Sequence, residues 1–249
     1  EAKEKSPAPA PSNQGVTYLS ASYRTEFVKE ETPVDFTKDA KGKVVARMLP
    51  TEEEVRNFKV DVKGSPELKV GESVNIELEN ISQYSRSVKG SGPEACYRAA
   101  ALQVAQTGVS TPEAARHCFQ VAVKENRRGA ITRLDYREME KGEAFTRSQI
   151  AKGKAVIWGL SYKDRAYNSD KMTDHYVVVT GFGVTDAGYP FVRFNDPGTK
   201  NASAGENLYL IKTEDPRTGK INWIGDGVNG KKNYLTRIIY DQNEVKTKI

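Results

Sequence analysis

The sequence predicts an α+β fold that carries a small β-rich module at its N-terminus. In the main part of the chain, helical patterns at 94–107 and 110–122 come first, and strong strand patterns follow from residue 154 onward. This order favours helices packed against an antiparallel sheet, because a parallel sheet needs a crossover connection between successive strands. A chain of 249 residues accommodates one main domain and a smaller module. We expect a flexible Pro/Ala-rich tether at 1–15, the module at 16–80 and the main domain at 81–249.

The composition is that of an ordinary soluble globular protein, with 37% hydrophobic and 29% charged residues. The net charge is only +5, since 38 basic side chains oppose 33 acidic ones, and no basic stripe is interleaved with aromatic residues. We therefore expect no nucleic-acid partner. The chain also lacks the long apolar run that a membrane span requires, and its composition leaves the oligomeric state open.

The N-terminal tether favours export. The chain starts at Glu1 without a methionine, and residues 1–15 resemble the polar segment that often follows a removed signal peptide. We therefore expect a secreted or periplasmic protein. The sequence leaves open whether residues 1–80 are a propeptide.

The predicted N-terminal module mixes strands with one helix. Residues 16–23 alternate like a strand, and 51–58 favour a short helix that opens at Thr51. Two further strands, at 58–62 and 70–78, are separated by a turn at Gly64-Ser-Pro66. We expect this module to pack on the main domain or to run into it.

Two helices are expected to form a hairpin at the start of the main domain. The first spans 94–107, with Ala99, Leu102 and Ala105 on one side, and Gly108 ends it. The second spans 110–122, because a capping Ser or Thr precedes a proline in its first turn.

The rest of the main domain is predicted to be mostly strands. A further short helix ends at 147–151. Apolar runs rich in β-branched and aromatic residues then predict strands at 154–160, 175–184 and 189–194, a hairpin formed by 208–212 and 221–224, and a last strand at 234–240.

Cys96 is the first candidate for chemistry. It lies three residues after Pro93, in the first turn of the helix at 94–107. Unpaired N–H groups and the positive end of the helix dipole favour a thiolate there, as a nucleophile requires. A cysteine among small residues such as Ala99-Ala100-Ala101 is also a common core residue, so this position alone does not decide the matter.

His175 is the candidate base. It opens the apolar strand at 175–184, so its ring can lie at the exposed end of the sheet, facing a helix N-terminus. The other histidine, His117, adjoins Cys118 in a predicted helix, and neighbouring helical residues point about 100° apart and cannot pair. We expect His117 to be a surface or boundary residue.

Asn195 and Asp196 follow the next strand and offer an acceptor that could orient His175. The same residues also suit a β-turn with an Asx cap. Alternation along the strand places Asp196 on the uniformly apolar side, with Val192 and Phe194. We expect that side to face the helix carrying Cys96, so that Asp196 meets His175 while Asn195 caps the turn.

These stretches together resemble the papain-like cysteine peptidases, in particular the branch that contains the leader peptidases of bacteriocin exporters and bacterial papain-like effector proteases. The matching segments are GPEACYRAAALQ at 92–103, RSQIAKGKAVIWGL at 147–160, HYVVVTGFG at 175–183 and FVRFNDPGT at 191–199. The resemblance implies a papain-like fold, in which the helix bearing the nucleophile packs on an antiparallel sheet. It implies Cys96 as nucleophile, His175 as general base and acid, and Asp196 as the residue that orients it.

The sequence departs from that branch at two places. The branch has a glutamine about six residues before the nucleophile, which helps to bind the oxyanion, whereas this chain has Gly90 there and its nearest glutamine is Gln83. Gln83 is therefore a secondary candidate, as Asn195 is for the orienting role. The nucleophile is followed by Tyr97-Arg98, where the branch favours Gly-Pro or Trp-Ala, so substrate preference does not transfer.

Three functions fit the sequence. The first is a cysteine hydrolase that cleaves peptide or amide bonds in a peptide, protein or cell-wall peptide through Cys96, His175 and Asp196. The second is a peptidoglycan amidase or a protein glutamine deamidase with the same three residues.

The third function is a non-catalytic binding module, in which Cys96 and Cys118 form a disulfide across the helical hairpin. We expect no cofactor. We also expect no metal site, since the cysteines and histidines have neither C-x-x-C nor H-x-x-x-H spacing.

Overall fold

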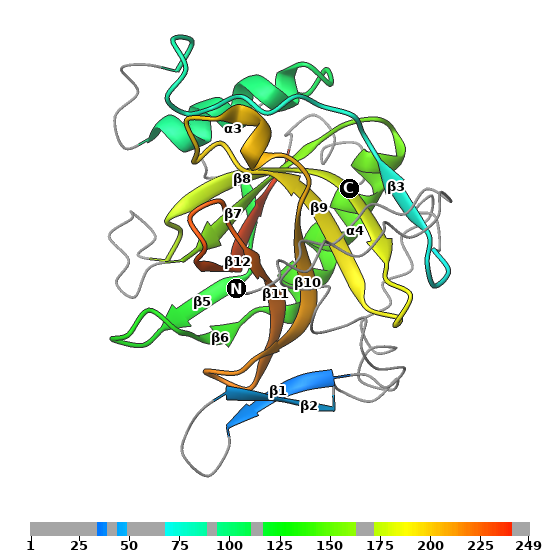
Figure 1. The fold of residues 1–249 in the computed structure, drawn as a ribbon, viewed down its shortest axis with the longest axis vertical. Coiled ribbons are helices and arrows are strands. Elements are labelled where there is room, and N and C mark those ends of the chain that lie inside the picture. Colours follow the sequence, from blue (N-terminus) through cyan, green and yellow to red (C-terminus); the bar gives the residue numbers. More distant parts are fainter. Residues whose placement is uncertain are drawn as a thin grey trace, which may run out of the picture.

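The computed structural model describes residues 34–38, 44–48, 68–88, 94–110, 117–162 and 172–240. Within these ranges the protein is a mixed α/β structure with one large antiparallel sheet and two α-helices (Figure 1). The helices are α3 (Ala95–Ala105) and α4 (Tyr136–Ala151), and a 3₁₀ turn, η2, spans Ala202–Gly205. The strands are β1 (Val34–Lys38), β2 (Val44–Met48), β3 (Ser73–Asn75), β4 (Cys118–Gln120), β5 (Ala122–Glu125), β6 (Ile131–Leu134), β7 (Val156–Ser161), β8 (His175–Val184), β9 (Pro190–Asn195), β10 (Leu208–Asp215), β11 (Lys220–Asp226) and β12 (Lys232–Ile239).

The large sheet has eight strands in the order β11-β10-β9-β8-β7-β12-β4, with β3 paired to β8. An additional pairing of β11 with β12 closes the strands from β7 to β12 into a barrel. Two smaller antiparallel pairs, β1 with β2 and β5 with β6, lie outside this sheet. Closure leaves few open strand edges among these strands, which is how antiparallel sheets limit unwanted pairing.

The two helices pack against opposite faces of the sheet, as the alternation along β7 shows. Val156, Trp158 and Leu160 lie in the largest core cluster, which also contains Met139 and Ile150 of α4. The intervening Ile157 packs instead with Ala100 and Val104 of α3. Successive side chains of a strand point to opposite faces, so one strand supplies both cores. Figure 1 shows α3 above the sheet, near β8.

Several sequence-based predictions are confirmed. The helix predicted at 94–107 is α3, and the strands predicted from residue 154 onward are β7 to β12, including the hairpin of β10 and β11. Within α3, however, Leu102 does not belong to the buried face, because 36% of it is exposed. The buried residues of the helix are Cys96, Ala99, Ala100, Gln103 and Val104.

The helix predicted at 110–122 is wrong over its described part. Cys118–Gln120 form β4, which pairs with Arg237–Ile239 of β12, and Ala122 begins β5. Residues 111–116 lie outside the described ranges. Helix propensity is a weak prior, and here pairing with a buried strand outweighs it. The helical hairpin therefore does not form in the described residues.

The short helix expected to end at 147–151 ends there, but α4 is 16 residues long. Its start is fixed by Asp135, whose carboxylate accepts hydrogen bonds from the backbone N–H groups of Arg137 and Glu138. An aspartate in this position satisfies two of the N–H groups that a helix leaves unpaired at its start.

The predicted N-terminal module is described only in part. The tether at 1–15 and the elements predicted at 16–23, 51–58 and 58–62 lie outside the described residues. The strand predicted at 70–78 is shorter, and as β3 it pairs with Gly181–Gly183 of β8 in the large sheet. None of the helices in the described ranges is long and apolar enough to cross a membrane.

Candidate active site

Cys96 lies in the first turn of α3 and is buried. Its sulfur hydrogen-bonds the side chain of His175, and the backbone N–H groups of Tyr97 and Tyr176 also donate to it. The N–H of Tyr97 is one of those that a helix start leaves without an intrahelical partner. Ala99 and Ala100 on the same helix are fully buried. Their small side chains let α3 lie close to the sheet, which brings the sulfur to the first residue of β8.

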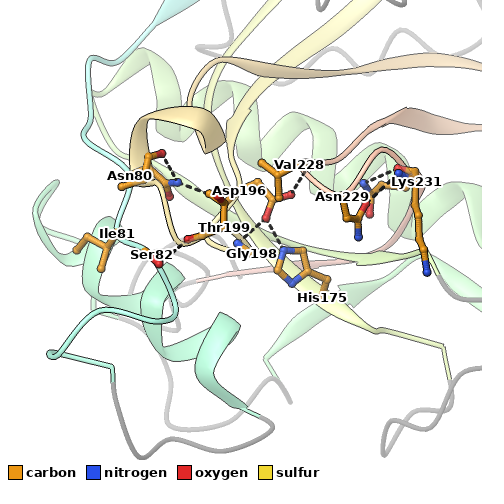
Figure 2. Close-up of polar contacts among 12 residues, drawn as sticks. Asn80, Ile81, Ser82, His175, Asp196, Gly198, Thr199, Val228, Asn229 and Lys231 are labelled. Carbon is orange, nitrogen blue, oxygen red and sulfur yellow. Dashed lines mark hydrogen bonds and ion pairs between the residues drawn. The ribbon is translucent and has the colours of Figure 1, made fainter.

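His175 is held by Asp196. It opens β8, opposite Leu160 of β7, and its side chain is almost completely buried. Its Nε2 lies 2.6 Å from Oδ1 of Asp196 (Figure 2). A carboxylate only accepts hydrogen bonds, so Nε2 carries the proton of this contact. The nitrogen left to face Cys96 is therefore Nδ1.

Asp196 is fixed by two backbone N–H groups. Gly198 donates to Oδ1 over 2.7 Å, and Val228, from the connection between β11 and β12, donates to Oδ2 over 3.2 Å (Figure 2). Gly198 has no room for a side chain, because a Cβ there would lie 2.9 Å from Oδ1 of Asp196 and 3.2 Å from the ring of His175. A glycine lets this loop close around the carboxylate.

The electrostatics of the three residues favour a thiolate facing an imidazolium. Burial alone would raise the pKa of Cys96, but the hydrogen bond and charge of His175, together with two backbone N–H groups, lower it below 9.0. Burial would lower the pKa of His175, whereas hydrogen bonds to Asp196 and Cys96 raise it to about 10. Burial would also raise the pKa of Asp196, but the hydrogen bond to His175 lowers it below 3.8. Such a thiolate is a strong nucleophile beside a ready proton donor.

Asn195 points away from His175. Its Nδ2 donates to the carbonyl of Leu78 over 2.7 Å, and the N–H of Gly198 in the turn donates to Asp196 instead, so Asn195 is not the expected turn cap. The expectation that Val192 and Phe194 of β9 face α3 is also wrong, because both lie in the core cluster shared with α4.

Asp196 nevertheless reaches His175. Alternation along β8 places His175 on the same side as Val177 and Val179, which belong to that core cluster.

Gln83 lies beside the loop that carries Asp196. Its backbone N–H donates to the carbonyl of Pro197 over 2.9 Å, and the hydroxyl of the preceding Ser82 donates to the carbonyl of Thr199. The Gln83 side chain is half-buried. Gly90, the position at which the resemblance implies a glutamine, lies outside the described residues.

An aromatic ring packs against His175, and a cation lies over that ring. The ring of Tyr162 meets the imidazole edge-on, with centroids 5.9 Å apart. Nζ of Lys231 lies 5.6 Å from the centroid of Tyr162, and Lys231 follows Val228 in the same connection as the Asp196 contact. Figure 2 shows this connection beside His175. Tyr162 therefore lies between His175 and the Lys231 ammonium.

Two further polar residues near Asp196 were not predicted from the sequence. Asn80 donates to the backbone carbonyl of Asp196, and Gln103 of α3 donates to Asn80. Asn80 carries no local pattern that marks it. Gln103 does, because a glutamine on the apolar stripe of a helix is unusual and indicates a specific buried partner.

The remaining cysteine and histidine lie apart from this group. Cys118 begins β4 and packs, half-buried, against the core beneath α3. The expected alternative of a Cys96–Cys118 disulfide is wrong, because both cysteines are free thiols. His117 directly precedes strand β4, whereas the sequence predicted that it lies in a helix. The centroid of its ring is 6.2 Å from that of Tyr240. Among the described residues, no group of three or more His, Cys, Asp or Glu side chains could hold a metal ion.

The chain matches no family model, no curated protein and no solved structure.

Proposed function

We propose that this protein is a papain-like cysteine hydrolase that cleaves peptide or amide bonds. The observation that carries the proposal is the contact between Cys96, at the start of α3, and His175, whose second nitrogen is held 2.6 Å from the buried carboxylate of Asp196. Nucleophile, base and orienting residue are the parts that covalent amide hydrolysis requires. The packing of α3 on an antiparallel sheet supports a papain-like fold.

In the first half of the reaction, the Cys96 thiolate attacks the carbonyl carbon of the substrate amide. A C–S bond forms, and the carbonyl π electrons move to oxygen. When the carbonyl reforms, the C–N bond breaks and His175 gives its Nδ1 proton to the leaving amine. The acyl group remains on Cys96 as a thioester. Asp196 keeps the ring in the orientation that serves both steps.

In the second half, neutral His175 removes a proton from a water molecule as the water oxygen attacks the thioester carbon. The C–S bond breaks, the acid product leaves, and Cys96 returns as a thiolate beside an imidazolium. The net reaction consumes one water per amide bond. N–H groups at the start of α3 are suited to stabilise the oxyanion, and Gln83 is a further candidate donor.

The test compares three amide substrates with the purified chain: casein for peptide bonds, peptidoglycan for cell-wall amides, and a glutamine-rich protein with ammonia release as the readout. Cys96→Ala should abolish turnover of whichever substrate the wild type uses and leave the fold intact. Cys118→Ala is the matched control and should keep most of the activity. Wild-type turnover that survives in Cys96→Ala would refute the proposal, as would no turnover of any substrate class.

A further inference from the structure

We propose that Asn80 and Gln103 are positioning residues that hold the main chain of Asp196 at a fixed place relative to the helix that carries Cys96. The inference rests on the proposed function, because it gives these two amides a task in the site formed by Cys96, His175 and Asp196. Neither amide touches the reacting atoms. They act through Asp196.

Asn80 joins two parts of the loop that follows β9. Its Nδ2 donates to the carbonyl of Asp196 over 2.7 Å and to the carbonyl of Ala202 over 2.9 Å (Figure 2). Its backbone N–H donates to the carboxylate of Glu206 over 3.1 Å. Only 6% of Asn80 is exposed, so losing these bonds would leave buried carbonyls unpaired. The amide therefore fixes both ends of the turn from 196 to 202.

Gln103 connects Asn80 to the nucleophile's helix. It is fully buried, and its Nε2 donates to Oδ1 of Asn80 over 3.0 Å. Gln103 lies seven residues after Cys96 in α3, which is about two helical turns and the same face. A buried glutamine is costly unless it is hydrogen-bonded, so this contact, with a second bond from Nε2 to the carbonyl of Ile81, ties α3 to residues 80–81.

The opposite side of the Asp196 backbone is held as well. Its N–H donates to the carbonyl of Gly205 over 2.7 Å. A Cβ at Gly205 would lie 2.1 Å from the carbonyl oxygen of Asp196 and 2.4 Å from Nδ2 of Asn80, so only glycine permits this approach. Both main-chain groups of Asp196 are thus engaged, which leaves the carboxylate little freedom.

These contacts link the residues of the site into a closed ring. It runs from Cys96 along α3 to Gln103, across to Asn80, on to Asp196, and back through His175 to Cys96. Without Asn80 the carbonyl of Asp196 loses its link to α3, and the bond of 2.6 Å to His175 is free to lengthen. A more distant carboxylate stabilises the imidazolium less, and the imidazolium in turn stabilises the Cys96 thiolate less.

The experiment measures the rate at which iodoacetamide alkylates Cys96 as a function of pH, by peptide mass spectrometry. The variants are Asn80→Ala and Gln103→Met, the second of which keeps side-chain length but removes the donor. Both should move the pH at which alkylation is half-maximal upward, by about half a unit or more. In an Asp196→Ala background the same substitutions should produce no further shift, because the residue through which they act is gone.

Asn222→Ala is the matched control, since Asn222 is also a buried asparagine whose Nδ2 donates to a backbone carbonyl, that of Leu235. It should lower the unfolding temperature without moving the alkylation profile. The proposal is overturned if Asn80→Ala and Gln103→Met behave like this control, or if their shift persists without Asp196. Alkylation needs no turnover, so this result is independent of whether Cys96→Ala abolishes hydrolysis.

Discussion

The Nε2 of His175 and Oδ1 of Asp196 lie 2.6 Å apart because two neighbouring antiparallel strands place these residues at the same end of the sheet. His175 is the first residue of β8, and Asp196 directly follows β9. Alternation places His175 on the side of Val177 and Asp196 on the side of Phe194, and Val177 and Phe194 belong to one core cluster. Extending the register of β8 and β9 places Asp196 opposite Val177, close to His175, and the N–H groups of Gly198 and Val228 hold its carboxylate there.

We predict that Asp196→Ala lowers kcat far more than Asn195→Ala. The loss for Asp196→Ala should be on the order of 100-fold to 10,000-fold, because the imidazolium loses its counter-charge and its orientation. Asp196→Asn should fall between the two, since it keeps a hydrogen-bond acceptor without the charge. Asn195→Ala should mainly lower stability, because its Nδ2 bonds the carbonyl of Leu78. Steady-state kinetics with thermal unfolding of each variant check this, and a larger rate loss for Asn195→Ala would refute it.

His175→Ala and His117→Ala should differ sharply in rate. His175 hydrogen-bonds both Cys96 and Asp196, so its loss removes the proton donor and should cost several orders of magnitude, roughly 1,000-fold or more. His117 contacts Tyr240 at the sheet edge and should matter little to turnover. Comparable losses of kcat/KM in the two variants would instead indicate a shared structural role.

The rate of hydrolysis should follow a bell-shaped pH profile. The lowered pKa of Cys96 keeps the thiolate present until the pH falls through that value, which lies below 9.0. The raised pKa of His175 keeps the imidazolium present until the pH rises through about 10. The ion pair exists between these limits, so kcat/KM should fall on both sides. A profile that instead rises steadily through pH 9.0 would show that Cys96 titrates as an ordinary thiol.

Lys231 should favour substrates with a carboxylate near the scissile bond. Its ammonium lies over Tyr162, whose ring meets His175, and it is exposed to solvent. Lys231→Glu should reduce kcat/KM for an acidic peptide relative to its lysine counterpart by about two- to fivefold, and the effect should fade at high salt. Lys220→Glu changes the net charge equally from the far end of β11 and is the control. An unchanged preference in Lys231→Glu would contradict this.

The sequence predicts those parts of the structure whose local pattern and tertiary role agree. Strands β7 to β12 are apolar runs with turns between them, and α3 has small residues on its buried side. Cys96, His175 and Asp196 could be named because each lies at the end of an element, where side chains of different elements meet. Their positions follow from the predicted element boundaries, whereas the role given to each comes from the resemblance.

The failures have a common physical cause, which is long-range pairing. Residues 118–120 look helical locally, but they pair with β12 more than 100 residues later. Which face of β9 meets α3 depends on how the two helices pack across the sheet, so alternation alone could not assign Val192 and Phe194 to the α4 side. Asn80 and Gln103 act through contacts with each other and with a distant loop. The position of Gln103 in the helix indicates that it has a buried partner, but no local pattern identifies Asn80 as that partner.

Competitive labelling of the non-reduced native protein with iodoacetamide at about pH 6 tests whether Cys96 is a thiolate activated by His175. Cys118 serves as the internal reference, because it packs half-buried under α3 and hydrogen-bonds Gln120 instead of a histidine. We predict that Cys96 reacts much faster than Cys118, by roughly tenfold or more, and that His175→Ala removes the difference. Equal labelling of the two cysteines in the wild type, or a Cys96 rate that His175→Ala leaves unchanged, would contradict it.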